Sequence, residues 1–340
     1  TGVFEYAILE YSGYGIYYQA DCCSGAGDFT LKNSKIRYSG GYGVRVSNAR
    51  QTSIVLEDNE ITGVESEAIY MWEGYGQTLI TIKRNKISNS NGGRVRFEQM
   101  GEVIFEDNEL TNNKNGSLRF GSFYGDISVK DNVFKNNNAN VNIYNPERLD
   151  PNDSDGVMSI LVEGNSIIEE DTDRWGGRLY FSNIRSAVDI LIQNNTIENR
   201  SDAIRLDGDS NNRVKILGNS IKGTKQGETG IYLSQKITGT IENNTIENKQ
   251  NGIYVAYSDA NGDGSGVIKG NVIKGNSGYG IRVESYAKPV ISLNDIENNS
   301  GYFVDNQTTF TVDARNNWWG ETLKAVIESG DNPRALDKFY

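Results

Sequence analysis

The chain has 340 residues with 38 Gly and 4 Pro, a composition that fits no ordinary helical core. Its formal net charge of −11 argues against a general nucleic-acid or anionic-membrane surface, because both need positive potential over a broad face. His is absent, which excludes imidazole acid–base chemistry, imidazole metal ligands and every Ser–His or Cys–His nucleophile. We expect no nucleic-acid partner and no organic cofactor.

The cysteines and the ends of the chain add little. Cys22 and Cys23 are neighbours, so a bond between them would be strained and no disulfide framework is expected. No apolar run approaches the roughly 20 residues of a membrane helix, and we expect no membrane insertion. Thr1 is not followed by a basic and apolar signal segment, so we expect a mature or truncated chain.

A pattern of apolar, any, any, Asn, any, apolar recurs along almost the whole chain. Ser34 and Tyr6 are assigned to the same slot in two further copies, and the steps between slots are mostly 22 to 28 residues. That period is typical of a solenoid. The ten Asn copies are Asn59, Asn85, Asn108, Asn132, Asn165, Asn195, Asn219, Asn244, Asn271 and Asn294.

Each copy predicts three short strands. An apolar pair such as Ile54 and Leu56 precedes the Asn, an apolar residue follows it, and a small-apolar-any-apolar motif such as Gly43–Val46 comes after a polar turn. One coil cannot bury its own apolar face, so we expect about 12 coils to stack about 4.8 Å apart with equivalent strands pairing in parallel. We expect the Asn to adopt the left-handed conformation at a sharp bend and to bond the next coil.

This all-β pattern resembles the right-handed parallel β-helix family, in its pectate-lyase-like superfamily, over roughly residues 3–312. The segment Asn316–Gly320 is similar to the tail of secreted bacterial β-helix proteins built from the same repeats. We therefore predict a β-helix over residues 1–315, lacking an N-terminal cap, and a C-terminal cap segment over 316–340. A short capping helix with Leu323, Val326 and Ile327 on one stripe would close the last coil. The resemblance implies an extracellular or cell-surface location but no particular activity, because the superfamily includes lyases, hydrolases, tailspikes and adhesins.

The residue between the two apolar positions of the third strand points outward, so stacking places these residues in one column. Five Arg and five Tyr in twelve positions make this column unusual. In chain order it is predicted to contain Tyr17, Arg45, Tyr70, Arg96, Arg119, Asn142, Tyr180, Arg205, Tyr232, Tyr254, Arg282 and Val304, and the same face carries Trp72, Glu98, Tyr144 and Asp207 two residues later in their strands.

Two interpretations of the column stay open. Arg stacks on Tyr in ordinary surface ladders, so the column could be structural. Alternatively Tyr and Trp offer flat faces to sugar rings and Arg forks a carboxylate or sulfate, as in a groove for an anionic polysaccharide. In the resembling lyases and hydrolases this strand bears the substrate cleft. The candidate polysaccharide-binding residues are Tyr17, Arg45, Tyr70, Trp72, Arg96, Glu98, Arg119, Asn142, Tyr144, Trp175, Tyr232, Tyr254 and Arg282.

Two features of this face suggest where a ligand would bind. Arg96 and Arg119 fall on adjacent coils, so we expect Glu98 or a bound anion between their like charges. The longest steps between Asn slots place insertions in Tyr144–Gly156 and Ile168–Gly177, which would wall the face and bring Trp175 beside it.

Catalysis is weakly indicated. Asp207 and Glu98 would lie about 19 Å apart, too far for a glycosidase pair, so Asp207 would need a second acid from an inserted loop. A polyuronate lyase would need a tyrosine base flanked by arginine, for which Tyr70 and Tyr180 are candidates. We name Tyr180, Arg205 and Asp207 as the candidate catalytic residues.

One segment has the spacing of a calcium loop. Asp259, Asn261 and Asp263 alternate and are followed by Gly264, but the acidic residue expected at position twelve is Gly270. Calcium would therefore be structural, and a polar turn without metal is an equal alternative.

The hypothesis that we favour is a secreted or cell-surface β-helix that binds an acidic polysaccharide along the Tyr and Arg residues. Degradation of the bound polysaccharide is a further hypothesis. The alternatives are a non-catalytic stalk or adhesin segment, and a polyuronate lyase or glycoside hydrolase. The sequence indicates no oligomeric state.

Overall fold

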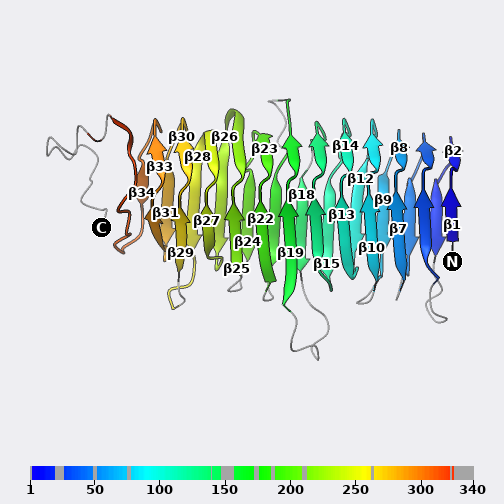
Figure 1. Ribbon diagram of the computed structural model, residues 1–340, viewed down its shortest axis with the longest axis horizontal. Helices are drawn as coiled ribbons and strands as arrows, with labels where there is room; N and C mark the ends of the chain where they lie inside the picture. The colour runs from blue at the N-terminus through cyan, green and yellow to red at the C-terminus, as the bar shows by residue number, and fades with distance from the viewer. Residues whose placement is uncertain are drawn as a thin grey trace.

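The computed structural model describes residues 2–19, 27–48, 52–74, 78–138, 140–146, 157–171, 176–184, 188–208, 213–261, 264–321 and 324. These residues form a rod of stacked coils whose strands succeed one another in chain order along the long axis (Figure 1). Each strand pairs in parallel with its equivalents one coil before and one coil after, as β7 (Ser53–Glu57) does with β4 (Phe29–Lys32) and β10 (Leu79–Lys83). The predicted parallel β-helix of about 12 coils is confirmed.

Every coil contributes one strand to each of three faces. The first face is a twelve-stranded sheet of β1 (Gly2–Glu5), β4, β7, β10, β13 (Glu102–Glu106), β16 (Ile127–Lys130), β19 (Met158–Glu163), β22 (Val188–Gln193), β25 (Arg213–Leu217), β27 (Gly239–Glu242), β29 (Ser265–Lys269) and β32 (Lys288–Ser292).

The second face, which follows the Asn slot, has short strands. They are β2 (Ile8–Glu10), β5 (Lys35–Arg37), β8 (Glu60–Thr62), β11 (Lys86–Ser88), β14 (Glu109–Thr111), β17 (Val133–Lys135), β20 (Ser166–Ile168), β23 (Thr196–Asn199), β30 (Val272–Lys274) and β33 (Asp295–Glu297).

The third face, called the Tyr/Arg face below, carries the predicted column. Its strands are β3 (Ile16–Gln19), β6 (Val44–Ser47), β9 (Glu67–Trp72), β12 (Arg94–Glu98), β15 (Leu118–Phe123), β18 (Val141–Pro146), β21 (Leu179–Ile184), β24 (Ile204–Gly208), β31 (Ile281–Ser285) and β34 (Val304–Asn306). Two longer strands, β26 (Ser220–Gln235) and β28 (Thr245–Tyr257), run through both the second and the third face.

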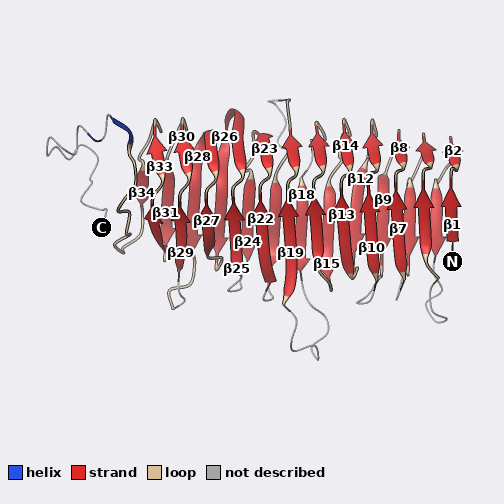
Figure 2. Cartoon of the chain, viewed as in Figure 1, coloured by secondary structure: helices blue, strands red, loops and turns tan. Residues whose placement is uncertain are grey.

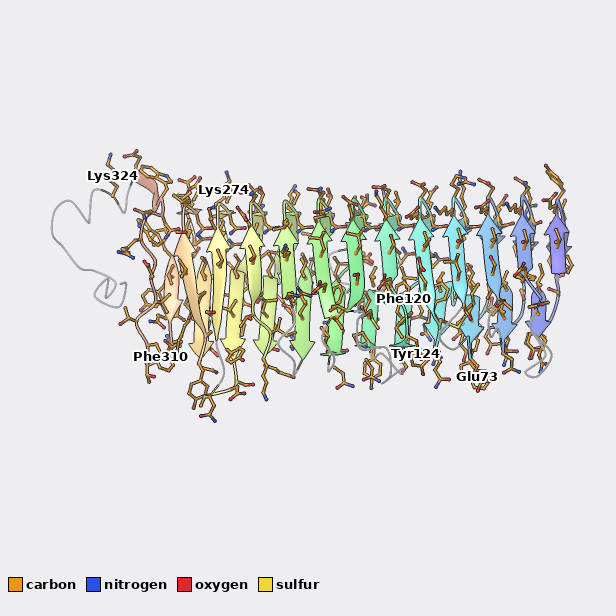
Figure 3. All side chains as sticks on the ribbon, turned by 60° about the horizontal axis from the view of Figure 1, so that its bottom comes forward. Glu73, Phe120, Tyr124, Lys274, Phe310 and Lys324 are labelled. Carbon is orange, nitrogen blue, oxygen red and sulfur yellow. The ribbon has the colours of Figure 1, made fainter. Side chains whose placement is uncertain are left out.

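The core follows from the alternation of side chains along each strand. In β7, Ile54 and Leu56 are fully buried while Ser53, Val55 and Glu57 face outward. Stacking repeats this pattern at every coil, so Ile, Val, Leu and Phe fill the interior, with Phe120 among the fully buried aromatic residues (Figure 3). Strands run along the whole length of the rod, and the described helix lies only near the C-terminal end (Figure 2).

The predicted column of Asn side chains is confirmed as a buried ladder. The Oδ1 of Asn219 accepts hydrogen bonds from the backbone N–H of Asn195 at 3.0 Å and from Asn195 Nδ2 at 2.9 Å. Asn195 Nδ2 also donates to the carbonyl of Val162, two coils before Asn219, at 3.0 Å. The same bonds recur between consecutive slots from Asn59 onward, and Ser34 takes the slot before Asn59. Each buried amide is therefore satisfied by its neighbouring coils.

Two details of the slot differ from the sequence prediction. The residue before each Asn, rather than the Asn itself, has the left-handed conformation, with φ of +57° at Asp58 and +55° at Arg84. Tyr6 stands at this preceding position with φ of +57°, and the slot belongs to Ala7, whose N–H donates to Ser34 Oγ at 3.1 Å. The bend needs a left-handed residue that is exposed, whereas the Asn is buried and serves the ladder.

The C-terminal tail continues the ladder. Asn317 Oδ1 accepts from the N–H and the Nδ2 of Asn294, both at 2.9 Å, so Asn317 is an eleventh Asn copy. Trp318 forms a parallel bridge with Asp295, and Trp319 packs edge-on against Phe303. Gly320, Glu321 and Lys324 are helical, and the stripe residues Leu323, Val326 and Ile327 of the predicted helix lie outside the described residues.

We predict that Asn195→Ala lowers the free energy of unfolding by about 2–3 kcal/mol, because it leaves the backbone N–H of Asn165 and the carbonyl of Val162 buried without their side-chain partner. Asn115→Ala is the matched control, since Asn115 is exposed and outside the ladder, and should change stability by less than about 0.5 kcal/mol. Urea denaturation followed by circular dichroism measures both. Equal losses of unfolding free energy in the two variants would show that the ladder hydrogen bonds do not stabilise the fold.

Candidate functional site

Eleven of the twelve residues predicted to share the outward column do share it. Tyr17, Arg45 and Tyr70 occupy equivalent positions in β3, β6 and β9, and the register continues through Arg282 in β31. The twelfth position is wrong in the sequence prediction: Arg282 pairs with Asp305, whereas Val304 pairs with the buried Ile281 and is itself only 3% exposed. The last member of the column is therefore an acid, Asp305, which is 5% exposed and lies beside Arg282.

Arg45 has an unusual environment. Its guanidinium carbon lies over three tyrosine rings, 5.2 Å from the centroid of Tyr17, 5.0 Å from Tyr42 and 5.7 Å from Tyr70. Its Nε is buried and makes no hydrogen bond, and no ion pair joins it to a carboxylate in the part of the chain that the structure describes. Cation–π contacts with the three rings therefore hold this arginine in place.

Arg96 and Arg119 share the carboxylate of Glu98. The sequence analysis expected either this residue or a bound anion between the two arginines. Arg96 Nε donates to Glu98 Oε1 at 2.8 Å, and Arg119 Nε lies 3.6 Å from the same oxygen. Gly121 makes room for this carboxylate, since a Cβ there would come within 2.2 Å of Glu98 Oε2. Arg119 is held less closely than Arg96, and 40% of its side chain is exposed.

Arg205 is enclosed by acids. Its Nε donates to Asp207 Oδ2 at 2.7 Å and its terminal nitrogen to Asp202 Oδ2 at 3.1 Å, while its guanidinium lies 4.3 Å from the Tyr232 ring centroid. Ser234 Oγ donates to Asp207 Oδ1. Burial acts to lower the pKa of Arg205, but the hydrogen bonds to the two aspartates and their charges outweigh it and raise that pKa. Both acids are themselves buried.

Arg282 is enclosed in the same way. Its guanidinium donates to Glu284 and lies 3.7 Å from Asp305 Oδ2. The rings of Tyr254 and Tyr279 lie beneath it, at 5.9 and 5.1 Å. The motif Gly-Tyr-Gly-apolar-Arg occurs twice in this position, ending once at Arg45 and once at Arg282. The two copies differ in whether described carboxylates lie beside the arginine.

Three tyrosines of the column, Tyr70, Tyr232 and Tyr254, have raised pKa values. Burial raises the pKa of Tyr70, outweighing the nearby Arg96 and Arg45. Burial also raises the pKa of Tyr232, and burial together with a hydrogen bond to Glu284 raises the pKa of Tyr254. A lyase base needs the opposite shift. Tyr180 lies between the guanidinium groups of Arg178 and Arg205, at 4.7 and 5.9 Å.

A glycosidase would need a second acid near Asp207. Asp202 shares Arg205 with it: Asp207 accepts from the Nε of Arg205 and Asp202 from a terminal nitrogen of the same guanidinium. Asp202 Oδ1 also accepts from the Thr229 N–H at 3.0 Å. Carboxylates already engaged by Arg205 and by backbone are poorly suited to protonate a leaving group.

Comparison with protein families agrees with this fold. The family described as right handed beta helix region matches residues 14–169, and the family described as periplasmic copper-binding protein (NosD) matches residues 151–331, more than half of the chain. The chain belongs to the NosD family. Its parallel β-helix is right-handed. No curated protein matches the chain significantly.

Within the NosD-family match, strand β28 contains a buried residue that the sequence analysis missed. Lys249 is 1% exposed, and its Nζ donates to Asn199 Oδ1 at 2.7 Å, to the Asn199 carbonyl at 3.2 Å and to the Ser201 carbonyl at 2.6 Å. Its side chain passes the position of Gly223, where a Cβ would lie 3.2 Å from Lys249 Cδ. Lys249 stands five residues after Asn244, and the residues at this step in other coils, among them Asn113 and Asn276, are buried too. The repeat could therefore have marked the position as buried.

The predicted calcium residues are only partly described. Asp259 Oδ1 accepts from the Asn261 N–H at 3.0 Å, and Asp259 Oδ2 forms an ion pair with Lys236 at 3.4 Å. Asp263 lies outside the described residues. Among the described residues, no group of three or more Cys, Asp and Glu is placed to hold a metal ion. Calcium binding stays a prediction.

The inserted segments cannot be placed beside the column. Tyr144, which begins the first insertion, is 43% exposed, whereas residues 147–156 of that insertion and Trp175 lie outside the described residues. No helix in the described ranges is long and apolar enough to cross a membrane.

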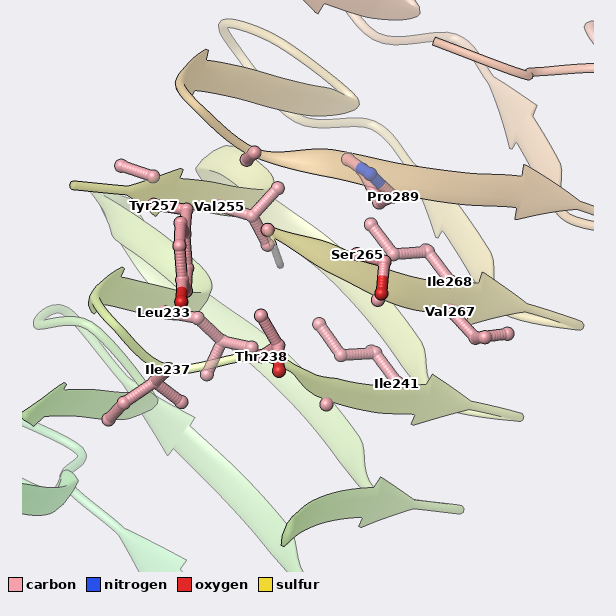
Figure 4. A pocket seen from close by; sticks show the side chains of 15 residues that line it. Leu233, Ile237, Thr238, Ile241, Val255, Tyr257, Ser265, Val267, Ile268 and Pro289 are labelled. Carbon is pink, nitrogen blue, oxygen red and sulfur yellow. The ribbon is translucent and has the colours of Figure 1, made fainter. Parts of the chain in front are cut away.

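A small hollow between the ends of β26, β28 and the starts of β27, β29 and β32 is no sugar site. It has a volume of about 20 Å³ and is lined mainly by apolar side chains, among them Leu233, Ile241 and Val255 (Figure 4). A space of this size holds one water at most.

Lys249 makes the stability of the protein dependent on pH. Burial lowers its pKa to about 7, although Asp202 and Glu228 act to raise it. In the unfolded chain this lysine keeps its proton until its ordinary pKa of about 10.4. Between these values the unfolded state binds one more proton, so the free energy of unfolding should rise with pH by at most about 1.4 kcal/mol per unit.

Urea denaturation at pH 7, 8 and 9 tests this, below the ionisation range of tyrosine. We expect Lys249→Met to remove the rise and Lys274→Met, which replaces an exposed lysine in the next coil, to retain it. If the unmodified protein shows no rise, Lys249 keeps its proton in the fold.

Proposed function

We propose that this chain binds an acidic polysaccharide outside the cytoplasm, on the N-terminal half of the Tyr/Arg face from β3 to β18. The observation that carries the proposal is the environment of Arg45, which has no carboxylate partner among the described residues, on a surface where Arg205 and Arg282 have such partners. A guanidinium held by aromatic rings and lacking an internal anion is prepared to fork a carboxylate or sulfate. Arg119, with its long contact to Glu98, offers a second such group.

Exposed aromatic side chains accompany these two arginines. Tyr17 is 51% exposed, Trp72 37% and Tyr144 43%, and all three stand on the same outward face. Flat aromatic surfaces take the apolar faces of sugar rings, and their polar edges take hydroxyl groups. Trp72 and Tyr144 are three coils apart, about 14 Å along the rod, which spans a few sugar units. A polysaccharide would therefore lie along the rod axis.

The C-terminal half of the face differs in its electrostatics. Arg205 and Arg282 are each engaged by two acids, which leaves little positive charge for a ligand. We therefore assign Tyr232, Tyr254 and Arg282 to the structural ladder and restrict the binding proposal to the first six coils.

Binding without cleavage is the form of the hypothesis that the site supports best. Burial moves the pKa of Tyr70 away from that of a base, and Asp207 is engaged by both Arg205 and Ser234. The alternative of a stalk or adhesin segment is favoured by the mutual stacking of Tyr and Arg, which by itself stiffens the face. The two functions differ in whether Arg45 contacts a ligand.

The family description also raises copper, and the residues of this chain do not fit it. Copper in proteins is held by imidazole, thiolate or thioether groups. The chain has no His, both of its Cys precede the matched residues, and Met158, the Met within the match, is 3% exposed in the core. We therefore propose the extracytoplasmic location of the family for this chain without its metal.

The binding proposal is tested with Arg45→Ala and its matched control Arg282→Ala. Loss of one charge-assisted, bidentate contact is expected to weaken binding to alginate, pectate or chondroitin sulfate about 10- to 100-fold for Arg45→Ala. Arg282→Ala should change affinity less than about 3-fold, because Arg282 is already paired with Glu284 and Asp305.

Affinity electrophoresis at fixed ionic strength, with a neutral glycan as a further control, measures the difference. Equal losses for the two variants, or no binding of any acidic polysaccharide, would support the stalk instead.

For copper, we expect a variant with both Cys22 and Cys23 replaced by Ser to retain no stoichiometric Cu(I) or Cu(II) after dialysis against a chelator. Metal analysis of the dialysed protein measures this, and retained copper would show a site that His, Cys and exposed Met do not explain.

A further inference from the structure

The outward side of the twelve-stranded sheet carries a second regular column, away from the Tyr/Arg face. Aliphatic and hydroxyl side chains alternate strictly over its first six strands, and Val267 and Val290 near its other end are 38% and 44% exposed. In strand order the column contains Val3, Thr30, Val55, Thr81, Ile104, Ser128, Leu161, Leu191, Lys215, Thr240, Val267 and Val290. We call it the aliphatic column.

The neighbouring column, two residues later in each strand, alternates in charge. Lys32 pairs with Glu57 at 3.0 Å, Lys83 with Glu106 at 2.8 Å and Lys130 with Glu163 at 3.4 Å. Its members over the first eight strands are Glu5, Lys32, Glu57, Lys83, Glu106, Lys130, Glu163 and Gln193. We call it the Glu/Lys column.

Both columns repeat every two coils, and they do so in phase. Over the first six strands, each Glu lies on a strand with an aliphatic residue and each Lys on a strand with Thr or Ser. Pairing within one chain accounts for alternating charges, but it gives no reason for the aliphatic and hydroxyl residues to alternate with them.

We propose that this face docks against the same face of a second copy of the chain, with the two rods antiparallel and related by a two-fold axis along the strands. Such an axis keeps each column opposite its own equivalent but reverses the order of the strands. When the axis passes between β10 and β13, Lys83 of one copy faces Glu106 of the other. In the same register Glu57 faces Lys130, and Lys32 faces Glu163.

The aliphatic column is complementary in this register too. Thr81 of one copy faces Ile104 of the other, and Thr30 faces Leu161. Val55 faces Ser128 and Val3 faces Leu191, so every opposed pair contains at least one aliphatic side chain. On the other edge of the sheet, Glu102 faces Leu79, and no two carboxylates are opposed.

The overlap therefore comprises eight strands rather than all twelve. Full overlap would shift the axis and place Lys32 against Lys269 and Glu57 against Glu242. Eight strands at about 4.8 Å, each about 17 Å long, bury roughly 650 Å² per copy. That gives about 1,300 Å² in total, within the range of specific interfaces of about 1,200–2,000 Å².

The dimer leaves the Tyr/Arg face open, because that face is a different side of every coil. The proposal is therefore independent of polysaccharide binding. A dimer would present two such faces running in opposite directions.

The test is the mass of the purified chain by sedimentation equilibrium, where one copy has 37.7 kDa. We expect a dimer at micromolar concentration. Ile104→Glu should weaken it at least about 100-fold, because it buries an unpaired charge at two symmetric places. The matched control, Val267→Glu, lies in the same column outside the overlap and should leave the dimer intact. Circular dichroism confirms that both variants fold.

A charge exchange tests the register without disturbing the aliphatic column. Lys83→Glu should weaken the dimer, because it places a carboxylate against Glu106 of the other copy. Adding Glu106→Lys should restore the dimer, because the two exchanged charges again face each other across the interface. Within each chain the double variant places residue 83 beside Glu57 and residue 106 beside Lys130, both with like charge. A monomer at all concentrations overturns the proposal, as does a dimer that Val267→Glu disrupts as strongly as Ile104→Glu.

Discussion

The buried Asn ladder is the constraint on which the rest of this molecule depends. Parallel strands pair through backbone groups that any sequence provides, so backbone pairing alone does not decide which residue lies above which. An amide inside the rod must find partners, and each Asn finds them only when the next Asn stands one coil above it. The ladder therefore fixes the vertical register, and with it every outward column.

The outward columns illustrate how register creates surface chemistry. Residues some 25 positions apart in the chain lie on adjacent strands, one strand spacing apart. A single carboxylate such as Glu98 can therefore contact arginines from two coils. Whether an arginine has such a carboxylate decides its role. Arg282 is paired with Glu284, whereas Arg45 has the same Gly-Tyr-Gly-apolar-Arg motif and no carboxylate partner among the described residues, which is why we propose Arg45 as a ligand contact.

Much of this could be predicted from the sequence, and the limits have physical causes. The Asn period and the strand alternation predict the solenoid, the stacked column and the position of Glu98 between Arg96 and Arg119, because these depend only on local spacing. The end of the column was wrong by one residue, since β34 carries Asp305 and Asn306 where earlier strands carry Arg and an aliphatic residue. Lys249 was missed because the analysis followed only the Asn slot and not the buried position five residues after it, and Asp202 was missed because its burial comes from contacts with neighbouring coils. The function of the column depends on partners across coils, which the spacing alone does not reveal.

The ladder also bears on how such chains change length during evolution. The bonds between Asn59 and Asn85 are the same as those between Asn195 and Asn219, although different loops join them. Duplicating or excising one whole coil would reproduce an interface that the rod already contains, whereas removing a few residues would displace every amide above the cut. Selection should therefore alter this rod by entire repeats or by loops at the corners, and the 33-residue step from Asn132 to Asn165 shows that the corners tolerate growth.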